Sequence, residues 1–426
     1  MRGDAISGPT CPQKRDICVH TLISEQVAKD PTKTALYCSK APFTYTEMNY
    51  LATQLAVYLR CCGVGVGSIV PLCFEQSIWT VIAMLAVMKA SAAFLALDAA
   101  LPISVLKHRI SQTGCNIMVV SPATESACRG LTPELVSLTS QLLLQLSKSE
   151  GESSLPDVPP DSPAYLVYTS GSTGPPKAVI VGHAAISTAL PLHAAAFDIN
   201  AKSRVLQFSS YAFDASICEI LATLTAGGTL CVPSEAERLD NIAHFMINAR
   251  VDTALLTPSF AATFTPDFVP CLKTLVLCGE APTQHVVEKW FGHVKLINAY
   301  GPTETCISCA AHTYGSQDDV AATIGCGYAH SLRVVDPEDH DKLMYFGGIG
   351  ELVVGGPALA WGYWNDPERT EYSFVKYLQW ISGEQNSQNG IYYKTGDLVR
   401  YNDRGLLEYI GRKDTYLRST QGSYVQ

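Results

Sequence analysis

Short apolar runs recur along the chain, and most of them end in Gly, Ser, Thr or Pro. In the first third, segments with a helical spacing of apolar residues separate these runs. Strands that alternate with helices predict parallel sheets joined by crossover helices. In such sheets ligands bind off the carboxyl ends of the strands, where small and polar residues collect. The strand-like runs are residues 68–75, 116–121, 164–169, 204–209, 229–234, 253–259, 274–280 and 296–301.

Two helical segments support this interpretation in the first third. Residues 45–60 place apolar side chains on one helical face, and Thr44 with Glu47 three residues later predicts a capping box at the helix start. Residues 77–90 are almost entirely apolar, which is typical of a buried helix. The apolar face of the first helix consists of Met48, Leu51, Ala52, Leu55 and Leu59.

The length of 426 residues predicts two to four packed units. A polar stretch rich in Pro and Ser at residues 148–163 is a linker candidate. From about Ala329 onward, strand-like runs lack a helical period, which predicts a small antiparallel barrel-like unit. The expected fold class is therefore α/β, with two α/β subdomains of mainly parallel sheets at residues 1–155 and 156–328 and a β-barrel subdomain at 329–411.

Composition excludes several classes of protein. Hydrophobic residues make up 47% and charged residues 16%, which indicates a globular chain. The net charge of -9 and the lack of a long basic run argue against a nucleic-acid partner. The most apolar long stretch, residues 78–97, is interrupted by polar residues and fits a buried helix and strand better than a membrane span. The amino terminus has no apolar core of signal-peptide length, so we expect a cytoplasmic protein.

The 15 cysteines are scattered without regular spacing. In a long chain this pattern indicates reduced, mostly buried thiols. The single CxxC at residues 306–309 has no second pair and no zinc-spaced histidines, so we interpret it as incidental.

The stretch TSGSTGPPK at residues 169–177 concentrates small donors beside one cation. It is not a Walker loop, because its glycines are spaced differently and Pro175 and Pro176 forbid immediate helix entry. Its hydroxyls, its backbone N–H groups and Lys177 could wrap a polyphosphate. A surface linker of the same composition is the alternative, and the stretch by itself does not decide between them.

Acidic turns follow later in the chain. INAYGPTET at residues 297–305 contains Glu304, which could hold Mg²⁺ together with phosphate oxygens or be an exposed turn acid. YKTGDLVRY at residues 393–401 places Asp397 after a glycine, and IGRKD follows at residues 410–414.

Together, the four stretches resemble the adenylate-forming enzyme superfamily, and within it the adenylation domains of nonribosomal peptide synthetases. The resemblance runs from about Val19 to Asp414. FTYTEM, LAVMKASAAFLALD, YAFDASICEIL and GELVVGGPALAWGYWNDPERT fit further motifs of the family in the right order. Ser91 and Ala96 stand where the family usually has Gly and Pro.

The resemblance implies an AMP-forming ligase that joins a carboxylate to the α-phosphate of ATP with Mg²⁺ and then passes the acyl group to the phosphopantetheine thiol of a carrier protein. It assigns catalytic roles to Lys177, Thr303 and Glu304, with Glu304 as the metal ligand. Tyr409 and Arg412 could instead be a core aromatic and a solvated turn charge. The implied ATP-binding residues are Thr169, Ser170, Gly171, Ser172, Thr173, Gly174, Lys177, Gly279, Glu280, Ala281, Asn298, Tyr300, Gly301, Thr303, Asp397, Tyr409 and Arg412.

The resemblance also implies an amino-acid pocket in which Asp214 receives the substrate's α-ammonium group. A helix-start Asp acting as a cap is the alternative. The matching pocket positions carry no other charge, so we expect an apolar substrate side chain, with room for an aromatic one. The implied pocket residues are Asp214, Ala215, Cys218, Leu255, Val276, Cys278, Ala299, Ile307 and Ser308.

After Asp414, which matches the family's hinge, the sequence departs from the family pattern. Residues 412–426 are expected to form the hinge and a divergent tail without the family's carboxy-terminal subdomain, so we expect weak adenylation at best. Two other functions remain open, an acyl- or aryl-CoA ligase of the same superfamily and a non-catalytic nucleotide-binding remnant. Asp214 argues against the first of these.

Overall fold

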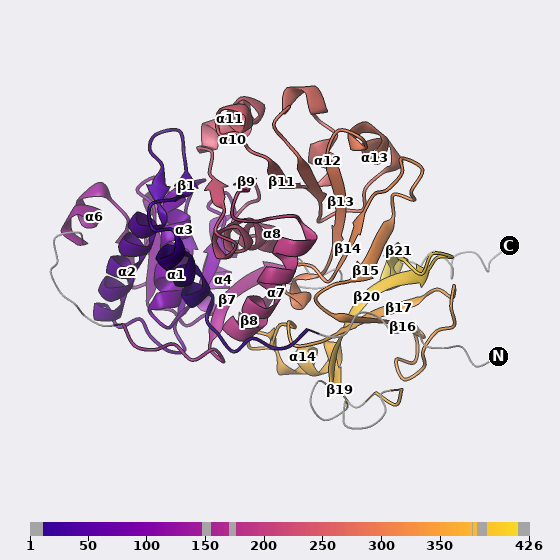
Figure 1. Ribbon diagram of the computed structural model, residues 1–426. Helices are drawn as coiled ribbons and strands as arrows, with labels where there is room; N and C mark the ends of the chain where they lie inside the picture. The colour runs from indigo at the N-terminus through magenta and orange to yellow at the C-terminus, as the bar shows by residue number, and fades with distance from the viewer. Residues whose placement is uncertain (1–11, 147–154, 170–175, 377, 381–389, 416–426) are drawn as a thin grey trace.

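The computed structural model describes residues 12–146, 155–169, 176–376, 378–380 and 390–415. Two sheets organise this part of the chain, and most helices lie on the side of the amino-terminal half (Figure 1). The α-helices are α1 (Val19–Lys29), α2 (Tyr45–Cys61), α3 (Ile78–Lys89), α4 (Ile103–Ser111), α5 (Glu125–Cys128), α6 (Ser140–Leu146), α7 (His183–Ala196), α8 (Asp214–Ile217), α9 (Thr223–Thr225), α10 (Glu235–Asp240), α11 (Ile242–Asn248), α12 (Pro258–Ala261), α13 (Gln284–Trp290) and α14 (Pro367–Ser373).

The first sheet has seven strands in the order β18-β8-β7-β4-β3-β5-β6. The strands from β7 to β6 run parallel, whereas β8 is antiparallel to β7 and β18 is antiparallel to β8. The bounds are β3 (Ile69–Cys73), β4 (Ala93–Leu97), β5 (Ile117–Val120), β6 (Glu134–Ser137), β7 (Pro163–Thr169), β8 (Lys177–Gly182) and β18 (Gly362–Tyr363).

The second sheet has fourteen strands in the order β16-β17-β20-β21-β15-β14-β13-β12-β11-β9-β10-β1-β2, with β19 paired to β20. Its neighbours from β13 to β1 pair in parallel, and those from β13 to β16 are antiparallel. The bounds are β1 (Thr34–Tyr37), β2 (Phe43–Thr44), β9 (Arg204–Leu206), β10 (Thr229–Cys231), β11 (Thr253–Leu256), β12 (Thr274–Leu277), β13 (Lys295–Tyr300), β14 (Ala310–Thr313), β15 (Thr323–Gly327), β16 (Ser331–Val335), β17 (Gly350–Gly355), β19 (Phe374–Lys376), β20 (Ile391–Tyr401) and β21 (Leu407–Arg412).

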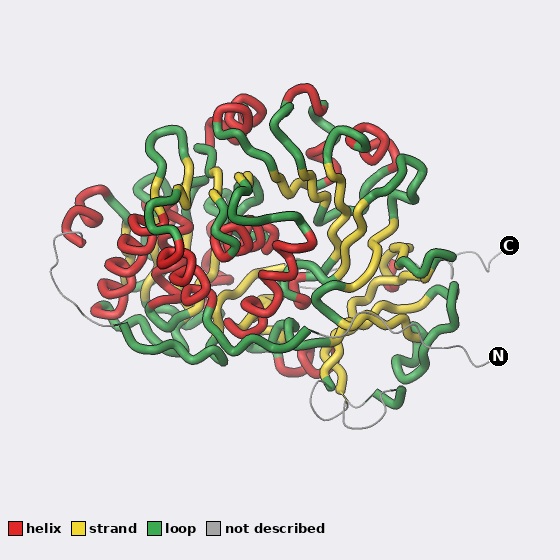
Figure 2. Tube along the Cα trace, viewed as in Figure 1, coloured by secondary structure: helices red, strands yellow, loops and turns green. Residues whose placement is uncertain are grey.

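The predicted α/β class is confirmed. Strands are present after residue 329 (Figure 2), and they pair antiparallel as predicted. They do not form a separate sheet, because β15 pairs with both β14 and β21 and so joins them to the parallel strands. Within the described residues, the pairing runs from β16 to β2 and records no closed barrel.

Strand pairing crosses the predicted boundary at residue 155. β7 and β8 follow this boundary, yet β7 pairs with β4 and β8 pairs with β7, in the sheet of the preceding part. β1 and β2 precede it, yet β1 pairs with β10 in the other sheet. The four predicted domain ranges stay a prediction.

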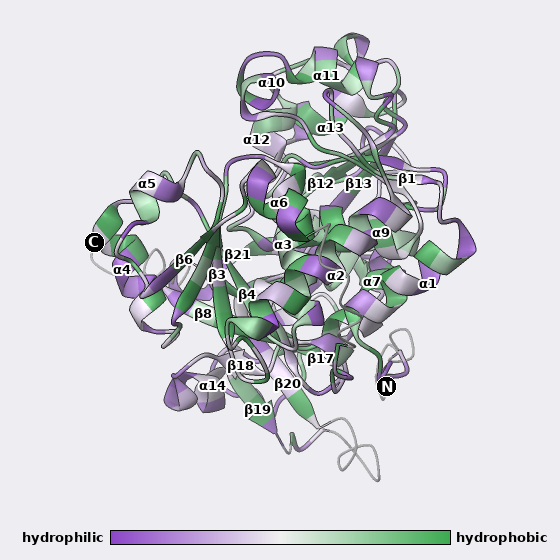
Figure 3. Cartoon of the chain, turned by 90° about the vertical axis from the view of Figure 1, so that its left-hand side faces the viewer, coloured by the Kyte–Doolittle hydropathy of each residue, from purple (hydrophilic) through white to green (hydrophobic). Residues whose placement is uncertain are grey.

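The two predicted helices are confirmed. Thr44 and Glu47 form the capping box of α2, and the buried face of this helix includes Met48, Ala52 and Leu55. α3 is buried on nearly all sides, and it lies between α2 and the strands β3 and β4. The strands of the first sheet consist largely of hydrophobic residues (Figure 3), and burial of these residues stabilises the packing of α3 on the sheet. No helix of the described residues is long and apolar enough to cross a membrane.

Ser91, which stands where the family usually has Gly, has an unusual backbone conformation. This residue follows α3 and adopts a φ of 65°, in the left-handed region that favours glycine. Its side chain is buried beside the start of β4. A serine therefore holds a turn for which the family usually has Gly, at some cost in backbone energy.

Candidate functional site

A cavity of about 310 Å³ opens where β12 and β13 end beside β20 and β21. We call it the Tyr300 cavity. It unites eight of the residues for which the sequence implied ATP binding, from segments far apart in the chain. Its walls are Gly279, Glu280, Ala281, Pro282, Asn298, Ala299, Tyr300, Gly301, Pro302, Ala322, Ile324, Asp397 and Tyr409.

Asp397 is held by two partners at the wall of this cavity. The Tyr300 hydroxyl donates a hydrogen bond to its Oδ2, and Arg412 Nη1 lies 3.1 Å from its Oδ1. Gly396 precedes it with a φ of 70°, and a Cβ there would lie 2.8 Å from the Arg412 guanidinium. Burial raises the pKa of Asp397, while the Tyr300 hydrogen bond and the Arg412 charge oppose that rise.

The remaining polar groups of the Tyr300 cavity are also fixed. The Asn298 amide nitrogen donates to the Thr323 carbonyl at 2.8 Å, so the orientation of this buried amide is set. Glu280 is exposed and accepts hydrogen bonds from the backbone N–H and the hydroxyl of Ser259. The Tyr409 ring lies 6.1 Å from the Tyr300 ring, centroid to centroid.

A second group of side chains surrounds Glu304, whose side chain is 3% exposed. Lys177 Nζ lies 2.7 Å from Glu304 Oε1 and 2.8 Å from the Tyr363 hydroxyl. The Tyr363 hydroxyl donates to the same Oε1 at 2.7 Å. Lys177 begins β8 in one sheet, whereas Glu304 follows β13 in the other, so this ion pair joins the two sheets.

Glu304 could hold a divalent cation. Mg²⁺ takes one or two carboxylates together with phosphate oxygens and water, so a single buried carboxylate beside a cationic lysine fits such a site when phosphate is present. The hydroxyl of Tyr363 and the Lys177 ammonium both contact Glu304 Oε1 and fix its position.

The predicted phosphate loop lies mostly outside the described residues. Ser170, Gly171, Ser172, Thr173 and Gly174 all fall in the range that the structure leaves undescribed. The two ends of the loop are described, since Thr169 ends β7 and pairs with Lys177 at the start of β8.

A smaller cavity of about 70 Å³ lies next to the first, and we call it the Asp214 cavity. It unites seven of the nine residues for which the sequence implied an amino-acid pocket. Cys218 and Val276 are not at its wall, although both are fully buried in the same core. Its walls are Phe197, Asp214, Ala215, Leu255, Cys278, Gly279, Ala299, Gly301, Ile307 and Ser308.

Among the described residues, Asp214 is the one carboxylate at the wall of this cavity. Burial raises its pKa to about 6, and the nearby Glu304 charge adds to the rise. A hydrogen bond from the Thr303 side chain opposes it. The carboxylate therefore lacks a cationic partner among the groups that shift its pKa, and it would gain energy from one.

The Asp214 cavity is smaller than an aromatic side chain requires. A cavity of about 150 Å³ is known to hold benzene, and this one measures about 70 Å³. The expectation of room for an aromatic substrate does not hold for this shape. Phe197 at the end of α7 takes up part of the space, and its ring stacks on His193 with an interplanar angle of 5°.

Two residues of the site were missed in the sequence. Tyr363 lies in the motif GELVVGGPALAWGYWNDPERT, so its tyrosine could have been linked to the family pattern, but not to Glu304. Phe197 follows an alanine-rich helix and lies in no motif, so only the structure brings it to the Asp214 cavity.

Comparison with known proteins gives one family. The sequence model of the family described as AMP-binding enzyme matches residues 23–364. The chain is 40% identical over 414 residues to nonribosomal peptide synthetase 5 of Gibberella zeae. The aligned region covers 96% of this chain and 4% of that protein. It is also 40% identical over 406 residues to N-benzoylphenylalaninol synthetase of Penicillium brevicompactum, covering 94% of this chain and 17% of the relative. The chain thus spans less than a fifth of the length of these relatives.

Solved structures show the same fold. The FmoA3 nonribosomal peptide synthetase bound to α-methyl-L-serine-AMP superposes with a TM-score of 0.83 at 24% identity, over 96% of this chain and 46% of that chain. The N-terminal subdomain of Klebsiella oxytoca NpsA, in complex with 3-hydroxybenzoyl-AMSN, gives a TM-score of 0.82 at 23% identity, over 94% of this chain and all of that one, at 100%.

Proposed function

The chain belongs to the family of AMP-binding enzymes, and on this premise we propose that it activates an α-amino acid for nonribosomal peptide synthesis. In the proposed reaction, an oxygen of the amino-acid carboxylate attacks the α-phosphorus of ATP. A P–O bond forms to the amino acid, the bond to the leaving pyrophosphate breaks, and an aminoacyl-adenylate results.

One observation carries this proposal. The Tyr300 cavity and the Asp214 cavity share Gly279, Ala299 and Gly301 as walls. A Cβ on Gly301 would lie 2.4 Å from the Ser308 Cα, so only glycine keeps this wall thin. A nucleotide in one cavity and an amino acid in the other would therefore be neighbours at these three shared residues, close enough for the carboxylate to reach the α-phosphate.

We infer that the Tyr300 cavity receives the nucleoside of ATP. Asp397 would accept hydrogen bonds from the ribose hydroxyls, and its fixed position supports that role because Tyr300 and Arg412 already hold its two oxygens. The amide oxygen of Asn298 would accept from the adenine amino group, since its nitrogen donates to Thr323.

The phosphates would extend toward Lys177 and Glu304. Mg²⁺, held by Glu304 and by phosphate oxygens, would neutralise charge on the pyrophosphate as it leaves. Lys177 would place its ammonium on the same phosphates, and its contact with Tyr363 keeps it directed into the site. The attack joins two anions, so positioning and charge neutralisation must supply most of the rate.

The amino acid would bind with its α-ammonium at Asp214 and its side chain against Phe197. The raised pKa of Asp214 supports this, because a buried carboxylate without a cation is costly and the ammonium would supply one. The cavity of about 70 Å³ and its uncharged walls favour a small aliphatic side chain. The hydrogen bond between Thr303 and Asp214 would link the ammonium site to the α-phosphate.

In the full synthetase system, we propose that the acyl group passes to the phosphopantetheine thiol of a carrier protein in the cytoplasm. The similarity to fungal nonribosomal peptide synthetases supports this acceptor. An acyl- or aryl-CoA ligase of the same family would not need the carboxylate of Asp214.

The test separates binding from turnover. Calorimetry would measure binding of 5′-O-sulfamoyladenosine analogues that carry alanine, valine, phenylalanine or benzoic acid as the acyl group. These stable analogues contain both halves of the adenylate, so they report on the joined cavities without a chemical step. We expect the alanine and valine analogues to bind at least tenfold more tightly than the phenylalanine and benzoyl analogues.

Amino-acid-dependent exchange of labelled pyrophosphate into ATP then tests the reaction. Tight binding of the benzoyl analogue in preference to all amino-acid analogues would replace our proposal with an aryl-acid ligase. Binding of ATP alone, with no added affinity from any acyl group, would identify a nucleotide-binding remnant.

A further inference from the structure

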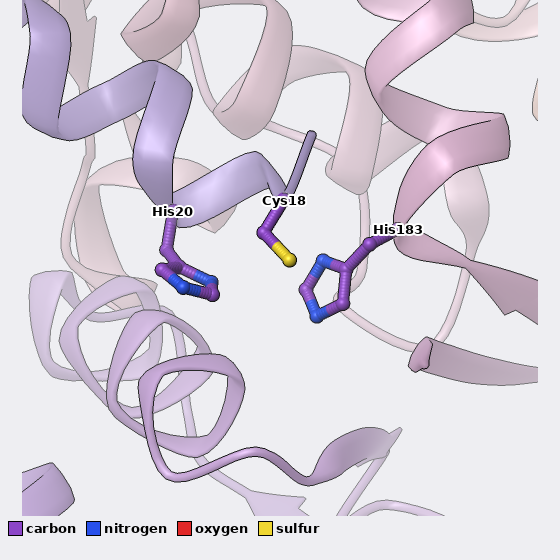
Figure 4. Close-up of side chains that lie close together, drawn as sticks. All are labelled: Cys18, His20 and His183. Atoms are coloured by element: carbon purple, nitrogen blue, oxygen red, sulfur yellow. The ribbon is translucent and has the colours of Figure 1, made fainter. Parts of the chain in front are cut away.

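Three potential metal ligands lie together far from the cavities described above. Cys18, His20 and His183 each offer one ligand atom, and these atoms lie within 4.8 Å of one another. Figure 4 shows the Cys18 sulfur directed between the two imidazole rings. Within the described residues this is the one group of three or more Cys, His, Asp or Glu side chains with such spacing.

The three residues come from two helices distant in sequence. Cys18 is the N-cap of α1, His20 lies in its first turn, and His183 opens α7 directly after β8. Cys18 and His183 are buried, and the two rings pack edge to face at 5.4 Å between centroids. The cluster thus ties the amino-terminal helix to the helix that follows β8.

The polar contacts of the cluster do not use all its nitrogens. Cys18 Sγ donates to the Val158 carbonyl at 3.1 Å, and the Val19 N–H donates to His183 Nδ1 over a long 3.4 Å. His20 Nδ1 and His183 Nε2 are buried without a hydrogen-bond partner among the described residues. Buried polar atoms are nearly always satisfied, so orphan nitrogens on two adjacent rings call for a ligand.

Each ring binds a metal through a nitrogen lone pair, which a neutral imidazole has on only one of its two nitrogens. In His183 the Val19 N–H donates to Nδ1, so Nε2 carries the ring proton, and metal binding through Nε2 requires the other tautomer and the loss of this long 3.4 Å hydrogen bond. The Cys18 thiol binds a metal as the thiolate, so it loses its proton on binding.

We propose that Cys18, His20 and His183 form a structural site for a soft monovalent metal ion, copper(I). The Cys18 thiol loses its proton to solvent, a bond forms between sulfur and copper, and the oxidation state of copper does not change. Thiolate is a soft ligand that favours copper(I) and zinc, and imidazole suits copper as well as zinc, iron and nickel. Metal–ligand distances of about 2.0–2.3 Å require the three groups to approach by only on the order of 1 Å.

Charge favours the monovalent ion over zinc(II). A copper(I) ion with one thiolate and two neutral imidazoles carries no net charge, whereas zinc(II) would leave one positive charge in a buried site. Lys89 already contributes positive charge beside His20. The described residues also supply three ligands here, and zinc(II) in structural sites takes four.

The test measures copper(I) stoichiometry by competition with bathocuproine disulfonate, without oxygen and with ascorbate as reductant. The parent chain carries Ser at Cys61 and Cys326, the two exposed cysteines among the described residues, to lower background binding. It is compared with Cys18→Ser, with His20→Gln and with Cys231→Ser. The last is a matched control, because Cys231 is also a buried free thiol but lies in a different core.

We expect the parent and the Cys231→Ser control to bind one more tight equivalent than Cys18→Ser. His20→Gln should lower the copper affinity at least tenfold. A hundredfold excess over Kd should raise the Tm of the parent by roughly 3 °C and leave that of Cys18→Ser unchanged. Circular dichroism checks that each variant is folded.

Equal stoichiometry in the parent and in Cys18→Ser would overturn the site, as would unchanged affinity in His20→Gln. Zinc(II) binding that depends on Cys18, in the absence of copper(I) binding, would overturn the proposed ion. None of these results depends on adenylation activity, so they leave the proposed function untouched.

Discussion

The Asp214 carboxylate should make amino-acid affinity depend on pH, and the size of the effect follows from its surroundings. Burial raises its pKa from 3.8 to about 6. Each unit corresponds to about 1.4 kcal/mol, so at neutral pH the free chain holds this charge at a cost on the order of 3 kcal/mol. An α-ammonium group in contact with the carboxylate would offset that cost.

Lowering the pH from 7 to 5 should therefore weaken the affinity for the alanine-bearing sulfamoyladenosine about tenfold. At pH 7 about nine in ten Asp214 carboxyls are ionised, and at pH 5 about one in ten, given a pKa of about 6. The range stays below the α-amino pKa of about 7.7–8.0, so the ligand keeps its charge. Calorimetry at pH 5, 6 and 7 would measure the change in Kd.

Asp214→Asn is the matched control, since it keeps the shape and removes the charge. It should bind the analogue on the order of a hundredfold less tightly at pH 7 and with no pH dependence over this range. An equal Kd at pH 5 and pH 7 for the unmodified chain, or the same pH dependence in Asp214→Asn, would refute the assignment of Asp214.

The same substitution should have the opposite effect on stability. Because the folded-state pKa of Asp214 is raised, the folded chain binds more protons than the unfolded chain between pH 3.8 and about 6. Its contribution to the free energy of unfolding is therefore greatest below this window and is lost as the pH rises through about 6. Asp214→Asn should lack this loss, so at pH 7 it should be more stable by on the order of 1–3 kcal/mol, measured by urea unfolding.

Three other substitutions test the rest of the site. Lys177→Met leaves the buried Glu304 without its cation. It should therefore lower the free energy of unfolding by about 3 kcal/mol and slow pyrophosphate exchange at least a hundredfold. Lys177→Arg, which keeps the charge, is the control, and an unchanged unfolding midpoint in Lys177→Met would contradict the role of this pair. Asp397→Asn weakens the contact with Arg412 and should raise the Kd of ATP at least tenfold, by calorimetry, and an unchanged Kd would remove Asp397 from the nucleotide site. Phe197→Leu should enlarge the Asp214 cavity and lower the free energy of unfolding by about 1–2 kcal/mol. Pyrophosphate exchange should then shift toward amino acids the size of leucine. If exchange is still highest with alanine, another residue of the wall limits the size of the substrate side chain.

The sequence was sufficient to predict the α/β class, the helix at Tyr45–Cys61 and the family, because periodicity and ordered motifs are local properties of the chain. The family resemblance also named eight of the residues that line the Tyr300 cavity. β12 and β13 are parallel neighbours, so the residues after their carboxyl ends meet at one edge of the sheet. The roles of those residues in ATP binding stay predictions.

Long-range pairing was beyond the sequence argument. The sequence after residue 329 predicted a separate antiparallel unit, because its turns and its alternation of apolar residues do not indicate which other strands it pairs with. The join depends on the contact between Ala310 in β14 and Gly327 in β15. A Cβ on Gly325 would lie 2.1 Å from the Ala311 carbonyl oxygen, so a glycine lets the two strands approach at this join.

The size of the Asp214 cavity escaped prediction for a related reason. The small residues Ala215 and Cys278 suggested an open pocket, because each was considered alone along the sequence. The volume of a cavity depends on every side chain that enters it, and Phe197 enters from a helix that carries no motif. Its ring is backed by His193 and Tyr328, which are hydrogen-bonded to each other at 2.7 Å, so it cannot easily withdraw. Substrate choice in this cavity is therefore set by the Phe197 ring as much as by the residues that flank Asp214. A relative with the same flanking residues but a smaller side chain in place of Phe197 should accept larger amino acids.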